Sequence, residues 1–194
     1  MANTSRINGF KPVKHLNGSP YNGQANLYYF ASSYATAAYI GDVVKIVTAA
    51  DTTGKAQTVE LAAAGNAAVG VIVGFVVNPT DLNVTGTYKP ASTARYCWVA
   101  DSPDVIFEAE ASNGTPVYSD LGLNVNHAIG TPNATMVRSG AYLDWGTEAN
   151  TATLTFKILS LVQRPDNEIG ASAKVLVKIN NHQLGSHTGT VGLP

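Results

Sequence analysis

The chain has 194 residues, a formal net charge of −1 and 13% charged residues. This length suits one domain with a sizeable core and is short for two. Because binding to a nucleic-acid backbone requires clustered lysine and arginine, the near-neutral charge argues against direct binding to DNA or RNA. Charged residues make up about 25% of a typical soluble domain. The surface is therefore either rich in uncharged polar residues or covered by other protein, as in an assembly subunit.

Residues 1–27 are predicted to form an N-terminal arm. The segment has three Asn-Gly pairs and two prolines, which favour turns, and it shows no sustained hydrophobic period. It also contains Phe10, Val13, Leu16 and Tyr21, which a solvated tail would not need. An arm that lies on another surface is therefore the expectation, with disorder as the alternative.

Residues 28–179 are predicted to form a β-rich body. Short runs of β-branched and alternating residues are separated by clusters of Gly, Asn and Pro, and no amphipathic helix is present. This pattern predicts an all-β fold, a single sandwich or barrel-like body of about eight strands with extended N- and C-terminal arms. The strand candidates are residues 39–47, 57–61, 69–77, 95–100, 105–110, 136–144, 152–160 and 173–179.

The two strands at 95–100 and 105–110 define a central β corner. Tyr96 and Trp98 share one face of the first strand, and Cys97 and Val99 share the other. Pro103 prevents a helix from continuing through the connection. The corner is expected to hold the shape of the body.

Acidic residues are concentrated at this corner. Asp101 and Asp104 suit a turn, because their side chains can accept hydrogen bonds from the backbone. Strand alternation places Glu108 and Glu110 on one face, roughly 7 Å apart. Turn and surface roles are the main interpretation, and a calcium site or a carboxylate pair for hydrolysis remains open.

The single cysteine and the histidines give no enzyme pattern. Cys97 excludes an intrachain disulfide and is interpreted as a buried thiol, with a nucleophile as the alternative. Residues 180–194 are predicted to be a C-terminal tail, in which His182 and His187 lack a third metal ligand. We expect no enzyme, no metal and no cofactor.

The first ten residues lack the basic region and apolar run of a signal peptide, so we expect synthesis in a cytoplasm without export by that route. The longest apolar run, residues 67–77, is too short to cross a bilayer, and no membrane association is expected.

Several stretches together are similar to one class of proteins: Arg6–Gly23, Pro90–Tyr96, Ala100–Glu108, Gln163–Gly170 and Val177–Leu184. They resemble small structural proteins of tailed bacteriophages that act as capsid decoration or cement proteins. The resemblance implies a β-rich virion subunit, expected as a homotrimer, on the exterior of the expanded head. There it would hold neighbouring major capsid proteins together. The candidate contacts to the capsid or to other subunits are Phe10, Val13, Leu16, Tyr21, Tyr28, Tyr29, His182 and Leu184.

Two other functions remain open. A tail-associated adhesin or glycan-binding module would use exposed aromatic rings, and the tyrosines to consider are Tyr28, Tyr29, Tyr34 and Tyr39. The main interpretation of these tyrosines is an ordinary position in the core or in a trimer interface. A hydrolase of cell-wall or capsule sugar would depend on Glu108 and Glu110 alone.

Overall fold

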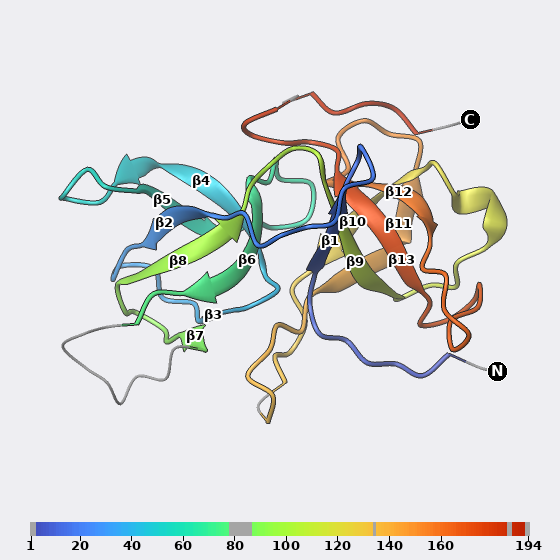
Figure 1. Cartoon of the computed structure of the whole chain (residues 1–194), viewed down its shortest axis with the longest axis horizontal. Coiled ribbons are helices and arrows are strands. Elements are labelled where there is room, and N and C mark those ends of the chain that lie inside the picture. Colours follow the sequence, from blue (N-terminus) through green and yellow to red (C-terminus); the bar gives the residue numbers. More distant parts are fainter. Residues whose placement is uncertain (1–2, 78–86, 134, 186–187, 193–194) are drawn as a thin grey trace.

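A computed structural model describes residues 3–77, 87–133, 135–185 and 188–192. In these residues the fold is all-β, which confirms the predicted class (Figure 1). It has thirteen strands and one short 3-10 helix, η1 (Tyr118–Asp120). The strands are β1 (Lys11–His15), β2 (Asn26–Phe30), β3 (Ala38–Tyr39), β4 (Val43–Ala50), β5 (Gln57–Leu61), β6 (Gly70–Phe75), β7 (Tyr88–Lys89), β8 (Arg95–Ala100), β9 (Val105–Ser112), β10 (Asn124–Ala128), β11 (Tyr142–Ala149), β12 (Phe156–Leu161) and β13 (Lys174–Ile179).

The first barrel closes in the order β2-β5-β4-β6-β8. The β2–β5 pair is parallel and the other pairs are antiparallel. Alternation along β8 directs Cys97 and Val99 into the barrel, where both are buried. The interior is filled by apolar side chains, including Phe30, Val44, Val59, Val69 and Ile72.

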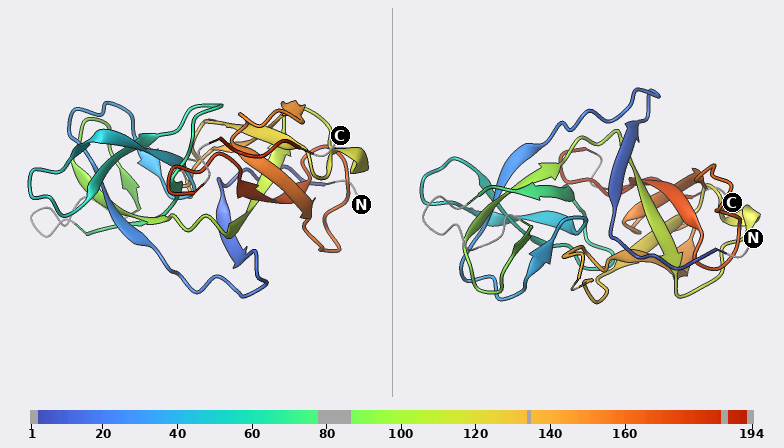
Figure 2. Two further views of the ribbon diagram at one scale, coloured as in Figure 1. Left: turned by 90° about the horizontal axis from the view of Figure 1, so that it is seen from above. Right: turned by 60° about the horizontal axis from the view of Figure 1, so that its bottom comes forward.

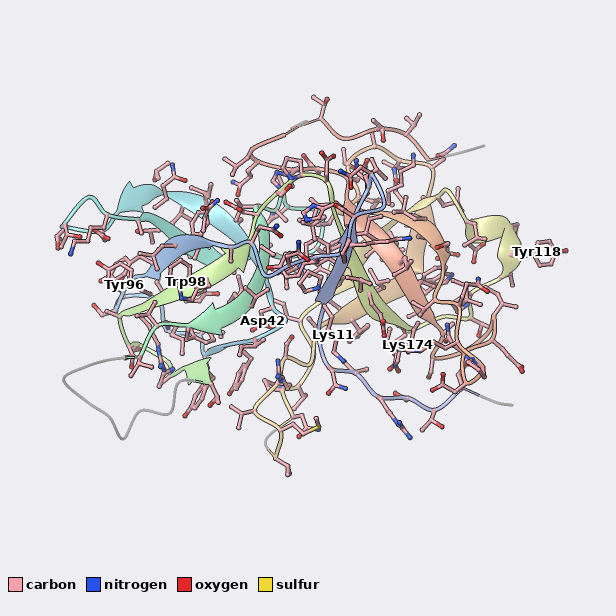
Figure 3. The ribbon with its side chains drawn as sticks, in the orientation of Figure 1. Lys11, Asp42, Tyr96, Trp98, Tyr118 and Lys174 are labelled. Atoms are coloured by element: carbon pink, nitrogen blue, oxygen red, sulfur yellow. The ribbon has the colours of Figure 1, made fainter. Side chains whose placement is uncertain are left out.

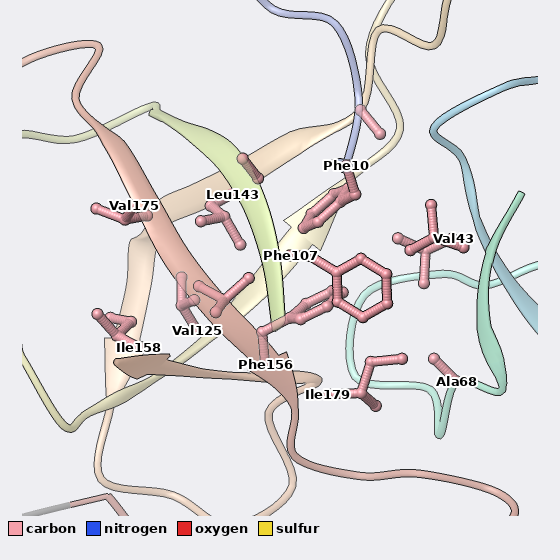
Figure 4. Close-up of a cluster of buried hydrophobic side chains, with 14 of the residues drawn as sticks. Phe10, Val43, Ala68, Phe107, Val125, Leu143, Phe156, Ile158, Val175 and Ile179 are labelled. Carbon is pink, nitrogen blue, oxygen red and sulfur yellow. The ribbon is translucent and has the colours of Figure 1, made fainter. Parts of the chain in front are cut away.

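The second barrel is also closed. Its strands pair in the ring β9-β11-β10-β12-β13, and β13 returns to β9. Strand β1 adds to β9 beside this ring, in antiparallel register from Lys11 opposite Glu108 to His15 opposite Val105. The interior is apolar, and its members include Phe107, Val125, Leu143, Phe156, Ile158 and Val175 (Figure 4).

The two barrels share a core. The buried cluster of the second barrel also includes Val43 of β4, Val71 of β6 and Ala68 just before β6. Figure 4 shows Val43 and Ala68 in this cluster. The Gln183 side chain adds a polar link, because its amide donates to the Ile46 carbonyl (3.1 Å) and accepts from the Ile46 N–H (2.6 Å). The barrels lie side by side in an elongated body (Figure 2).

The described residues form thirteen strands, of which ten make two barrels, where the sequence predicted a single body of about eight strands; β1 adjoins the second barrel, and β3 and β7 form a separate two-stranded sheet. The strands β3 and β7 have only two residues each, so they carry no period that a sequence pattern can show. Strand β1 is bulged between Pro12 and Lys14, which interrupts its alternation.

The N-terminal segment packs against the body, although the sequence predicted an extended arm. Phe10 is 2% exposed, and its ring stacks on Phe156 with 4.6 Å between ring centroids. The Asn3 side-chain amide donates to the carbonyls of Glu168 (2.8 Å) and Ala171 (2.9 Å). Phe10 is therefore part of the chain's own core and Tyr21 packs against it, whereas Val13 and Leu16 remain exposed.

The C-terminal segment also lies on the body in its described part. His182 is buried, and the Asn180 side chain accepts a hydrogen bond from the Thr190 N–H at 2.9 Å. The Lys157 ammonium donates to the Val191 carbonyl at 2.8 Å. His187, considered in the sequence as a second histidine of the tail, lies outside the described residues.

Candidate functional site

The structure separates the predicted contact residues into three groups. Val13, Leu16 and Leu184 are exposed, and Tyr21 and Tyr29 are partly buried. The remaining candidates, Phe10, Tyr28 and His182, are buried within the chain itself.

These buried residues are corrections to the prediction, because none of them can contact another protein in this structure. Phe10 belongs to the second core. Tyr28 points into the first barrel, and its hydroxyl donates to Asp101 at 2.8 Å. Burial, reinforced by Asp101, raises the pKa of that hydroxyl. The His182 Nδ1 accepts from the Leu184 N–H at 3.0 Å, within a turn.

An aromatic face covers the outside of the first barrel, formed by Leu27 and Tyr29 of β2 and Tyr96 and Trp98 of β8. Tyr29 lies opposite Tyr96, with ring centroids 5.1 Å apart, and Leu27 lies opposite Trp98. Trp98 is 42% exposed and lies opposite Gly74 of β6. Figure 3 shows Tyr96 and Trp98 side by side on this barrel. The sequence placed these two residues on one face but could not show that it faces outward.

An open hollow of about 590 Å³ lies beside Trp98, lined also by Tyr21, Gly23, Ala25 and Val73. Tyr21 and Val73 also line a second hollow of about 200 Å³, which reaches Pro12 and Arg138. The two hollows therefore share a wall and extend from the aromatic face to the junction of the barrels.

A second exposed apolar surface, the η1 tip, consists of Val117, Tyr118 and Leu121. Tyr118 is 82% exposed. The turn is fixed by Asp120, whose carboxylate accepts from the Trp145 Nε1–H (2.8 Å) and from the Val117 N–H (2.9 Å). Figure 3 places Tyr118 at the end of the molecule opposite Tyr96. Sequence reasoning missed this surface, and the available signal was the apolar pair Val117-Tyr118 after a proline.

A polar cleft of about 420 Å³ lies between the N-terminal segment and the second barrel. Its lining includes Arg6, Lys11, Glu108, Arg164 and Lys174. Arg164 forms ion pairs with Glu108 (3.1 Å) and with Asp166 (3.6 Å).

Both glutamates considered for hydrolysis form ion pairs with basic side chains. Glu110 is 3% exposed and is bound by the Lys174 ammonium, by the Ser5 hydroxyl (2.6 Å) and by the Arg6 N–H (2.7 Å). Glu108 is held by Arg164. Their partners come from distant parts of the chain, so the sequence pattern could not reveal them.

Other buried polar groups serve the packing of the barrels. The Asp42 carboxylate accepts from the Ser139 hydroxyl (2.5 Å) and from the Tyr39 N–H (2.7 Å), and burial raises its pKa to about 6. The His127 Nε2 lies 2.8 Å from the Ala62 carbonyl, and burial lowers the histidine pKa to about 4. Burial also raises the pKa of the Cys97 thiol, which disfavours the reactive thiolate.

Within the described residues, no group of three or more His, Cys, Asp or Glu side chains could hold a metal ion. The described part of the chain also contains no helix with the length and apolar character needed to span a membrane. No family model, no curated protein and no solved structure matches this chain.

Proposed function

We propose that this chain is a virion structural protein that binds the exterior of a phage head and bridges neighbouring major capsid subunits. One observation carries the proposal. The aromatic face and the η1 tip are exposed apolar surfaces at opposite ends of an elongated body (Figure 3). A protein that bridges two neighbours needs two separate contact surfaces.

The composition of these surfaces supports a protein partner. Tyrosine and tryptophan are enriched among the residues that dominate binding energy at protein interfaces. The low charge of the chain, 13% of its residues, limits the cost of removing charged groups from water on docking. Because the barrels share a core, a load applied at one end is transmitted to the other.

Binding only to the mature lattice would stabilise the shell by mass action. The sequence resemblance supports a homotrimer on the capsid. Three copies of each surface would strengthen attachment, since each engaged contact raises the effective concentration of the next.

The test measures co-sedimentation of the purified protein with expanded heads that lack it. We expect saturable binding and a higher temperature of head disruption. Trp98→Ala and Tyr118→Ala should each weaken binding by about tenfold or more, as loss of a dominant interface residue does. Ile129→Ala, which removes an exposed apolar side chain outside both surfaces, is the matched control and should leave binding unchanged. Absence of binding by the unaltered protein would refute the proposal.

A glycan-binding adhesin is the second candidate, and the hollow beside Trp98 favours it. Aromatic faces next to an open hollow suit the apolar faces of sugar rings. Of the tyrosines considered earlier, only Tyr29 contributes to this face. Tyr28 is buried, Tyr34 stacks on Phe30 at 5.8 Å against the first core, and Tyr39 stacks on Tyr88 at 5.2 Å. Binding to host cells or glycans without capsids, lost in Trp98→Ala, would select this function over the first.

A further inference from the structure

The polar cleft is built from segments that are distant in the sequence. One wall is the N-terminal segment, including Arg6, Asn8 and Lys11, and the other includes Glu108 of β9 and residues 164–174. The N-terminal wall is held in place because Asn3 donates to two carbonyls of the loop before β13. The Arg6 N–H also donates to Glu110. The cleft is therefore formed before any ligand arrives.

The charges in the cleft are only partly compensated. Arg164 is paired with Glu108 and Asp166, and Lys174 is paired with Glu110. Within the described part of the chain, the side chains of Arg6 and Lys11 form no ion pair or hydrogen bond. Arg6 and Lys11 are thus cationic side chains of the N-terminal wall that no ion pair of the described residues engages, although Lys11 lies opposite Glu108 in the β1–β9 register.

These groups are suited to a carboxylate. A guanidinium binds a carboxylate through parallel N–H donors, and a neighbouring ammonium adds a further charge-assisted hydrogen bond. Asn8 also lines the cleft and adds an amide that can donate to a peptide carbonyl. Figure 3 shows Lys11 and Lys174 on the same side of the second barrel.

We infer that the polar cleft binds the carboxylate groups of an acidic peptide segment, with Arg6 and Lys11 as its main contacts. The inference rests on the proposed function for its partner, since the segment then belongs to the major capsid protein. A nucleic acid is disfavoured because the chain has a formal net charge of −1, whereas binding to a phosphate backbone requires clustered lysine and arginine.

Fluorescence anisotropy tests the chemistry of the cleft, with the full chain and a labelled oligoglutamate peptide at low ionic strength, where screening is weakest. The double variant Arg6→Gln/Lys11→Gln should weaken binding by about tenfold, since it removes two charge-assisted contacts. The control Lys45→Gln/Lys55→Gln makes the same change in net charge on the first barrel and should leave binding within about twofold. Similar losses in both variants, or no binding by the unaltered chain, would overturn the inference.

Two further measurements identify the ligand and separate this inference from the proposed function. Tighter binding to a labelled oligothymidylate than to oligoglutamate would assign the cleft to phosphate and overturn the peptide. With expanded heads, weaker binding of the cleft variant than of its control supports both proposals. Heads that bind the two variants equally refute the cleft as a capsid contact and leave the proposed function standing. Peptide binding without head binding refutes the function and leaves the chemistry of the cleft standing.

Discussion

Replacing Phe10 with alanine tests whether the N-terminal segment belongs to the core. The ring is 2% exposed, stacks on Phe156 at 4.6 Å and meets the His127 ring edge-to-face at 6.2 Å. Truncation of a buried phenylalanine to alanine costs about 3–5 kcal/mol. Loss of aromatic pairing accounts for about 0.5–1.5 kcal/mol of this. Since whole domains are stable by only about 5–15 kcal/mol, Phe10→Ala should remove a large fraction of the total.

Urea denaturation followed by tryptophan fluorescence measures this loss. We expect a lower midpoint with an unchanged denaturant slope, and a Tm lower by roughly 6–20 °C. The control is Val13→Ala on the same segment, which is exposed and should cost less than about 0.5 kcal/mol. A cost below about 1 kcal/mol for Phe10→Ala would show that the ring is not part of the core, and would restore the interpretation as a detachable arm.

Three further predictions concern buried charges. Because the pKa of Asp42 is about 6 in the fold and 3.8 unfolded, its contribution to stability is present below pH 4 and is lost as the pH rises through 6, about 3 kcal/mol in all. The urea midpoint of Asp42→Asn should therefore not show this decrease between pH 4 and pH 7. His127, with its pKa lowered to about 4, has the opposite effect, since its contribution is present above pH 6.5 and is lost as the pH falls through 4. His127→Gln should therefore be less sensitive to acid than the unaltered chain in thermal melts from pH 7 to pH 4. Lys174→Met leaves the Glu110 carboxylate buried without its ion-pair partner and should cost about 3–5 kcal/mol in urea denaturation, whereas adding Glu110→Gln should recover part of that loss.

The sequence predicted elements whose alternation continues through the whole strand. In β8, Cys97 and Val99 were placed on one face and Tyr96 and Trp98 on the other, and the structure keeps that division. Which face points inward depends on closure of the barrel. Closure of the five-stranded barrel places Cys97 inside, where it is buried, and leaves Trp98 outside, 42% exposed.

The candidate site was less predictable because it depends on long-range pairing. Glu108 and Glu110 were correctly assigned to a strand, but their partners Arg164 and Lys174 lie more than fifty residues away. No local sequence pattern indicates that these four residues are in contact. The Asn-Gly turns of the N-terminal segment were equally ambiguous, since turns occur both in mobile arms and between packed strands.

The corner between β8 and β9 explains how two small barrels can form one body. Ala100, before the corner, and Val105, after it, both lie in the shared core. Between them, the Asp101 carboxylate accepts from the Tyr28 hydroxyl at 2.8 Å and from the Asn26 amide at 3.0 Å, which fixes the corner to the first barrel. The Asp104 carbonyl accepts from the Leu16 N–H at 2.8 Å, which fixes it to the residue after β1. Because the connection is held from both sides, the aromatic face and the η1 tip keep a constant separation. Under the proposed function, a fixed separation would let one molecule select a particular spacing of subunits on a shell.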